Sequence, residues 1–120
     1  GDNLILTIRF LDPQTNNQNG DNPSVARVDV IMGDIVGTAT DKTIDKHSST
    51  RVLARFTAGD WSKNGVYQEV SYQLPTLTAD SYIRVRGTNT TELEPSADPR
   101  GENPWSDLWF YANPIRLRLK

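Results

Sequence analysis

The last sixteen residues of the chain, Trp105 to Lys120, decide its fold class; they read WSDLWFYANPIRLRLK. From Ile115 onward, apolar and basic residues alternate, and this period of two is typical of a half-buried β-strand. Pro114 has no N–H to donate to a neighbouring strand, so it predicts an edge, a bulge or a change of sheet at that point. We therefore expect one long strand over Trp105–Leu119, kinked at Asn113-Pro114, that closes a β-sandwich.

Strand-like alternation recurs along the rest of the chain, and turn-forming residues separate the segments. An apolar period of 3.6 residues does not persist for about ten residues anywhere, so we expect no long helix. About seven short strands indicate an all-β fold, a Greek-key sandwich or a barrel, and the Asn-Pro break favours an immunoglobulin-like sandwich in which the last strand passes between sheets. The expected strands are Leu4–Leu11, Val25–Gly33, Ile35–Thr38, Thr50–Ala58, Val66–Leu74, Ser81–Gly87 and Trp105–Leu119.

The same alternation predicts which side chains face the core. In the first strand Leu4, Leu6, Ile8 and Phe10 form the inward face. The opposite face also carries apolar residues, so we expect that an upstream domain covers it. In later strands the inward sets are Ala26, Val28, Val30 and Met32, then Val52, Ala54 and Phe56, then Val66, Val70, Tyr72 and Leu74.

One short motif points to the sandwich class. At the head of the sixth expected strand, Asp80-x-Tyr82 resembles the tyrosine corner of immunoglobulin-like sandwiches. In that motif the tyrosine hydroxyl bonds back to the backbone of the upstream corner. We expect the same bond from Tyr82.

Length and charge limit the function classes. The chain has 120 residues, a formal charge of −2 and no cysteine. This balance predicts neither a nucleic-acid surface nor a polybasic membrane patch, and no apolar run approaches the roughly 18 residues that span a bilayer. The chain begins Gly-Asp-Asn-Leu without an initiator methionine. We therefore expect a single domain, residues 1–120, cut from a longer protein and monomeric in isolation, with an extracellular or cell-envelope location favoured.

Two loops carry oxygen-bearing side chains that would suit calcium. The loop at 12–24 offers Asp12, Asn19 and Asp21, and the loop at 88–104 offers Asp98 and Glu102. The spacing in the first loop does not match an EF-hand, and a plain solvated loop is the alternative for both. The second loop could instead be a docking surface. Calcium is the one cofactor that the sequence suggests.

Catalytic residues are not expected. His47 is the only histidine, no ligand partner lies near it in sequence, and no Gly-x-Ser-x-Gly motif is present. We therefore predict no catalytic, cofactor-binding or transition-metal residue. Four aromatic residues form a candidate binding surface for sugars or another ligand, although Trp61 could instead cap the core. They are Trp61, Trp105, Trp109 and Tyr111.

The C-terminal third is similar to a known group. Ser81–Gly87 reads SYIRVRG, and Asp107–Ile115 reads DLWFYANPI. These segments resemble the last two strands of a β-sandwich accessory domain at the C-terminus of bacterial PHP-type metal-dependent phosphoesterases. That group has a Tyr-x-Arg-x-Arg-Gly strand followed by a Trp-x-x-x-Asn/Ser-Pro-Ile strand.

What this resemblance implies is an accessory role. In that group the catalytic histidines and aspartates belong to an upstream hydrolase domain, so no catalytic residue is carried over. We expect a non-catalytic accessory or interaction domain of a larger secreted or envelope hydrolase, with the upstream catalytic domain as its partner. The alternative is an extracellular carbohydrate- or calcium-binding module.

Overall fold

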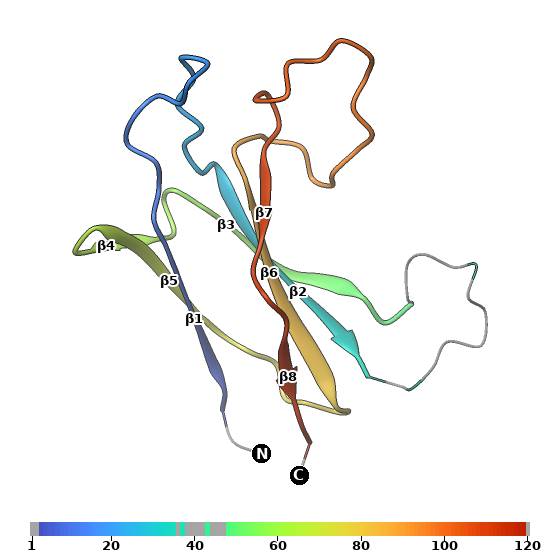
Figure 1. Ribbon diagram of the computed structural model, residues 1–120. Helices are drawn as coiled ribbons and strands as arrows, with labels where there is room; N and C mark the ends of the chain where they lie inside the picture. The colour runs from blue at the N-terminus through green and yellow to red at the C-terminus, as the bar shows by residue number, and fades with distance from the viewer. Residues whose placement is uncertain (1–2, 36, 38–42, 44–47, 120) are drawn as a thin grey trace.

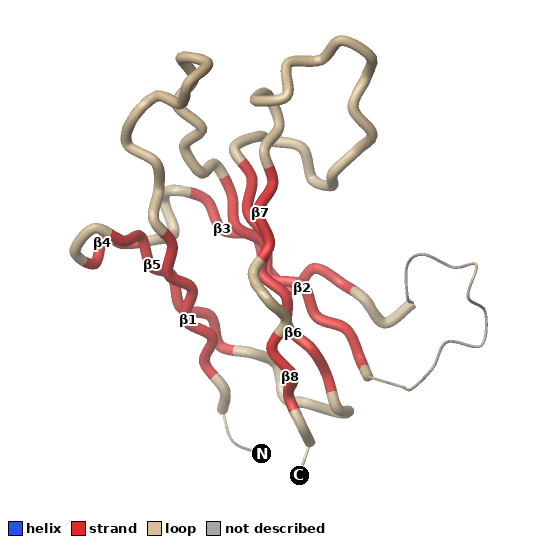
Figure 2. Tube along the Cα trace, in the orientation of Figure 1, coloured by secondary structure: helices blue, strands red, loops and turns tan. Residues whose placement is uncertain are grey.

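The computed structural model describes residues 3–35, 37, 43 and 48–119. These residues form eight strands and no helix, so no membrane-spanning helix occurs among them (Figure 2). The all-β prediction is confirmed. His47 and most of the predicted loop at 39–49 lie outside the described residues. The strands are β1 (Ile5–Phe10), β2 (Arg27–Asp34), β3 (Arg51–Thr57), β4 (Ser62–Asn64), β5 (Tyr67–Gln73), β6 (Ser81–Thr88), β7 (Trp109–Tyr111) and β8 (Ile115–Leu117).

The strands form two antiparallel sheets that face each other (Figure 1). The smaller sheet has the order β1-β5-β4, and the larger has the order β3-β2-β6-β7, with β8 also pairing with β6. The loops at 11–26 and 89–108 project from the same end of this sandwich (Figure 1). Elements far apart in sequence therefore meet at that end.

The core lies between the sheets and follows the predicted alternation. Inward side chains of β2 and β6 meet inward side chains of β1 and β5, as well as Leu74 just after β5. Removing such side chains from water is the main force that holds two stacked sheets together. The buried apolar residues are Ile8, Val28, Val30, Met32, Val70, Leu74, Ile83 and Val85.

The closing segment differs from the single long strand expected. It forms two short strands, β7 and β8, and both pair with β6 in the same sheet. Pro114 therefore marks a break within one sheet and not a change of sheet, because the chain returns to β6 after the residue that cannot donate. Residues 105–108 form a loop. In it the backbone N–H of Leu108 donates a hydrogen bond to the side-chain oxygen of Asn89 (2.7 Å).

Four further expectations differ from the structure. Pairing between β2 and β3 shifts at Val30/Ile31, and this bulge turns Leu53 towards the core instead of outward. Ile35, the first residue of the strand expected at 35–38, is not part of a strand, and positions 36 and 38 lie outside the described residues. Val66, which was expected to face the core, is exposed in the turn before β5. The hydroxyl of Tyr82 bonds the hydroxyl of Thr50 (3.0 Å), a side chain across the sheet, and not the corner backbone.

Strand β4 was not predicted. It has three polar residues, Ser62–Asn64, with no apolar alternation to reveal it. It forms because Gly65, with a positive φ of 64°, makes the tight turn that pairs Asn64 with Tyr67.

Candidate functional site

The outer face of the larger sheet, which points away from the smaller sheet, carries a buried ionic cluster. Asp29 on β2 is 1% exposed and accepts hydrogen bonds from three arginines on three strands. The nitrogen-to-oxygen distances are 2.7 Å to Arg27, 3.0 Å to Arg55 and 2.9 Å to Arg86. Arg86 also binds Glu94 (2.7 Å). We call these five residues the Asp29 cluster.

The Asp29 cluster fastens the start of the long loop to the sheet. The guanidinium of Arg27 donates to the carbonyl of Glu92 (2.6 Å), and that of Arg86 donates to the carbonyl of Leu93 (2.9 Å). Trp109 packs across Arg27 and Arg86, with 5.9 and 5.4 Å from the ring centroid to the guanidinium carbons. Buried arginines therefore satisfy loop carbonyls that would otherwise lack donors.

The pKa of Arg86 shows the balance within this cluster. Burial favours the neutral form and lowers the pKa, but hydrogen bonds to Glu94 and Asp29 outweigh it, so the pKa of Arg86 lies above its ordinary value. The guanidinium stays charged under all ordinary conditions. Arg86 is consequently a permanent cation of the Asp29 cluster.

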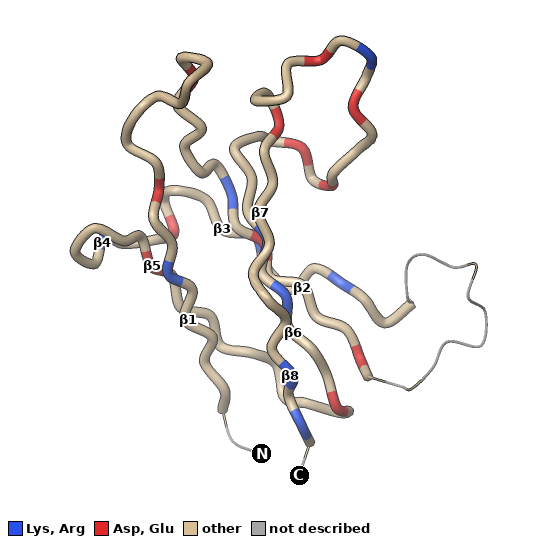
Figure 3. The backbone as a smooth tube through the Cα atoms, in the orientation of Figure 1, with Lys and Arg blue, Asp and Glu red and all other residues tan. Residues whose placement is uncertain are grey.

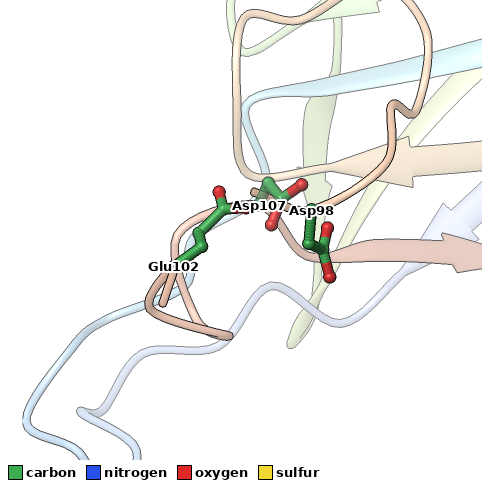
Figure 4. A group of neighbouring side chains, drawn as sticks. All are labelled: Asp98, Glu102 and Asp107. Carbon is green, nitrogen blue, oxygen red and sulfur yellow. The ribbon is translucent and has the colours of Figure 1, made fainter. Parts of the chain in front are cut away.

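Beyond this anchor the loop is acidic. Residues 89–108 contain five carboxylates and one arginine, and Figure 3 shows the red segments along the loop. Asp98, Glu102 and Asp107 lie close together, with one carboxylate oxygen from each within 4.8 Å of the others (Figure 4). We call these three residues the acidic triad. Among the described residues, none forms an ion pair with any of the three.

Local turns bring the acidic triad together. The backbone N–H of Ser106 bonds the carbonyl of Asn103 (3.0 Å), which returns Asp107 towards Glu102. The Ser106 hydroxyl donates to one oxygen of Glu102 (2.9 Å). The other oxygen, Oε2, is buried and has no hydrogen-bond donor among the described residues. Carboxylate oxygens of this kind are the ligands that Ca²⁺ and Mg²⁺ take.

The other predicted calcium ligands are not assembled in this way. Asp12 accepts the backbone N–H of Val25 (2.8 Å), and Asp21 accepts the side-chain amide of Asn19 (2.8 Å). Both carboxylates therefore serve as acceptors of hydrogen bonds from residues of the same loop or its end. The structure therefore brings Asp98 and Glu102 together, whereas no group of three acids among the described residues includes Asp12 or Asp21.

The four aromatic candidates do not share one face. Trp61 packs edge-on against Phe10 at 5.0 Å between centroids, in line with its interpretation as a cap. Trp109 lies over the Asp29 cluster and is half-buried. Trp105 is in the long loop, and Tyr111 on β7 is exposed. A flat stacking platform made of all four is therefore not present.

An apolar pocket of about 500 Å³ opens at the loop end, between the end of β1 and the strand β7. Apolar side chains line most of it, and two of its lining residues, Leu11 and Phe110, are strongly exposed. Concave apolar surfaces of this size are where ligands or partner side chains bind. Further lining residues are Phe10, Pro13, Pro23, Val25 and Leu108.

Sequence reasoning missed the Asp29 cluster and Asp107. The alternation placed Arg27 and Asp29 together on the outward face, and the close spacing of opposite charges there was the available signal. Nothing local showed that the loop would cover that face. Asp107 was overlooked because the closing strand was expected to include it.

Comparisons with protein-family models, with curated proteins and with solved structures found no match.

Proposed function

We propose that the chain is a non-catalytic accessory domain of a larger bacterial hydrolase, of the PHP-type phosphoesterase class, and that it works by binding a neighbouring protein domain. The observation that carries this proposal is the exposed apolar surface beside β1. Ile5 at the start of this edge strand is 66% exposed, and Leu11 just beyond its end is 62% exposed. The non-catalytic part rests on composition, because one histidine and no cysteine leave few groups for metal or nucleophilic chemistry.

The strand orders support the finer fold within this proposal, an immunoglobulin-like Greek-key sandwich. Such sandwiches have one sheet in the order A-B-E-D and the other built on C, F and G, with C′ next to C in some members. The order β1-β5-β4 corresponds to B-E-D, and β3-β2-β6-β7 corresponds to C′-C-F-G. A counterpart of strand A is not found among the described residues.

The parent class draws its support from the segments at 81–87 and 107–115. In the structure these segments are neighbours, because β6 pairs with both β7 and β8. The resemblance thus falls on one continuous part of a sheet. The two segments also touch through their side chains, because the ring of Phe110 lies where a Cβ at Gly87 would be.

The accessory role is tested by the motion of the domain beside its neighbour. In the parent protein, ¹⁵N relaxation should give this domain the rotational correlation time of the whole particle. A correlation time typical of about 13 kDa, the mass of the isolated chain (13.4 kDa), would show independent tumbling and refute the proposal.

A second candidate function is calcium binding by the acidic triad. Three carboxylates within 4.8 Å repel one another by about 1 kcal/mol per pair even in bulk water. A divalent cation would remove this repulsion and give the buried Oε2 of Glu102 a partner. Backbone carbonyls and water would have to complete the six to eight oxygens that Ca²⁺ takes.

We expect Ca²⁺ to raise the melting temperature, and EDTA to reverse the rise. At 100 times the dissociation constant, the gain in stability should be about 2.7 kcal/mol. Asp107→Asn should abolish the gain, whereas Glu92→Gln, in the same loop but outside the acidic triad, should keep it. Equal melting temperatures with Ca²⁺ and with EDTA would rule out the site.

A further inference from the structure

On one side of the sandwich the larger sheet extends further than the smaller sheet. The smaller sheet ends at β1, and on the other side of β1 no described strand pairs with it. The larger sheet continues past β6 to β7 and β8. The pocket confirms which edges meet, since Phe10 and Leu11 at the end of β1 line it together with Leu108 and Phe110.

Side chains along this side point inward but are not covered. Phe110 is opposite Gly87, and Ile115 is opposite Ile83, so both lie on the core face of the larger sheet. Nevertheless Phe110 is 41% exposed and Ile115 is 48% exposed. Ile83, the direct neighbour of Ile115 on the same face, is 1% exposed. We call this uncovered strip the open seam; by alternation it also includes Leu4 and Leu119, which are 38% and 47% exposed.

The edge of β1 offers hydrogen bonds to whatever covers the open seam. β1 has six residues, contains no proline and is paired with β5 on one side only. An edge strand of this kind presents free backbone N–H and C=O groups, which an extended segment can satisfy. The apolar floor and the unpaired edge therefore belong to one site.

We propose that the open seam accepts one extended strand from the neighbouring domain, which adds to the free edge of β1. The strand would carry apolar side chains at alternate positions, facing Phe110, Ile115 and the pocket. Its other side chains would be polar where they neighbour Thr7 and Arg9 on β1, whose partners Ser71 and Glu69 are polar as well, and apolar beside the exposed Ile5. This inference rests on the proposed accessory function and gives the partner its chemistry.

A second copy of the chain fits this site less well than a single strand. If β1 paired with β1 of another copy, the larger sheets of both copies would meet at the open seam. Their β7 and β8 strands would then compete for the same space beside β1. A lone strand needs only the width of one position, about 4.8 Å from β1. The partner is therefore an extended segment and not another sandwich edge.

The test tethers a probe strand to the chain. A strand of alternating valine and threonine, with the length of β1, is joined to the N-terminus by a flexible glycine-serine linker, which gives an effective concentration in the millimolar range. Alternate amides of β1 should then exchange with deuterium at least about tenfold more slowly than in a chain with the linker alone. A probe with serine in place of valine should give no such protection.

Matched variants show whether the probe occupies the open seam. Ile115→Ser should reduce the protection about tenfold, whereas Tyr111→Ser, on the outer face of β7 and equally exposed, should change it less than about twofold. Leu11→Ser, at the exposed rim of the pocket that the probe would also contact, should reduce the protection as well and leaves the core intact. Unchanged β1 exchange with the tethered probe, or equal effects of Ile115→Ser and Tyr111→Ser, would overturn the proposal. So would a dimer with protected β1 amides in the chain without the probe. None of these results depends on the parent protein, so they can fail while the accessory role stands.

Discussion

Replacing Asp29 with asparagine should lower the free energy of unfolding by about 3–5 kcal/mol. The side chain keeps its size but loses its charge, so Arg27, Arg55 and Arg86 remain close together with only Glu94 to balance them. Removing one partner of a buried ionic cluster is expensive, because the remaining charges stay out of water without compensation. Urea unfolding monitored by tryptophan fluorescence measures the loss.

The matched control is Glu69→Gln, which makes the same chemical change in another strand. Glu69 also binds an arginine, Arg9 (2.9 Å), but on the exposed face of the smaller sheet. Hydrogen bonds from Asn64 and then Arg9 lower the pKa of Glu69, so its contribution is present above the ordinary carboxyl pKa and is lost as the pH falls below it. At pH 7 the free energy of unfolding should fall far less in Glu69→Gln than in Asp29→Asn, because exposed ion pairs contribute little. Equal losses would show that the Asp29 cluster is not an anchor.

Ile83→Ala should destabilise the domain by about 2–5 kcal/mol. Ile83 lies in the middle of the larger sheet between Met32 and Ile115 and is fully buried. The substitution removes apolar contact and leaves a cavity in a close-packed core. Thermal or urea unfolding gives the value.

Ile115→Ala is its natural comparison, because the two isoleucines are cross-strand neighbours on the same face. In the isolated chain Ile115 is half exposed, so its loss should be below about 1 kcal/mol. With the probe strand tethered, the same substitution should become more costly, since the strand would bury the side chain. A large effect of Ile115→Ala in the isolated chain would mean that the seam is already closed.

Alternation predicted the main strands well, because β1, β2, β5 and β6 each place one apolar face in the core. Val28, Val30 and Met32 occupy the core as their spacing indicated. Alternation failed where a turn or a bulge, and not the burial of apolar side chains, determines the strand or its facing. The polar strand β4 depends on the turn at Gly65, and the bulge opposite Val30/Ile31 moves Leu53 to the inner face.

The site was only partly predictable, because its contacts join distant segments. Arg27 meets the carbonyl of Glu92, 65 residues away, and no local pattern encodes this contact. Asp98 and Glu102 could be selected from composition alone, but their approach to Asp107 depends on turns at Asn103 and Ser106. Apolar Ile5 and Leu11 indicated from the sequence that a partner covers the first strand, but the open seam lies on the core side, mainly over β7 and β8.

Hydrogen exchange of β1 in the parent protein tests the central claim most directly. The claim is that a neighbouring segment completes the smaller sheet at the free edge of β1. Alternate amides of residues 5–10 should exchange at least about tenfold more slowly in the parent than in the isolated chain. Identical exchange of these amides in both proteins would contradict it.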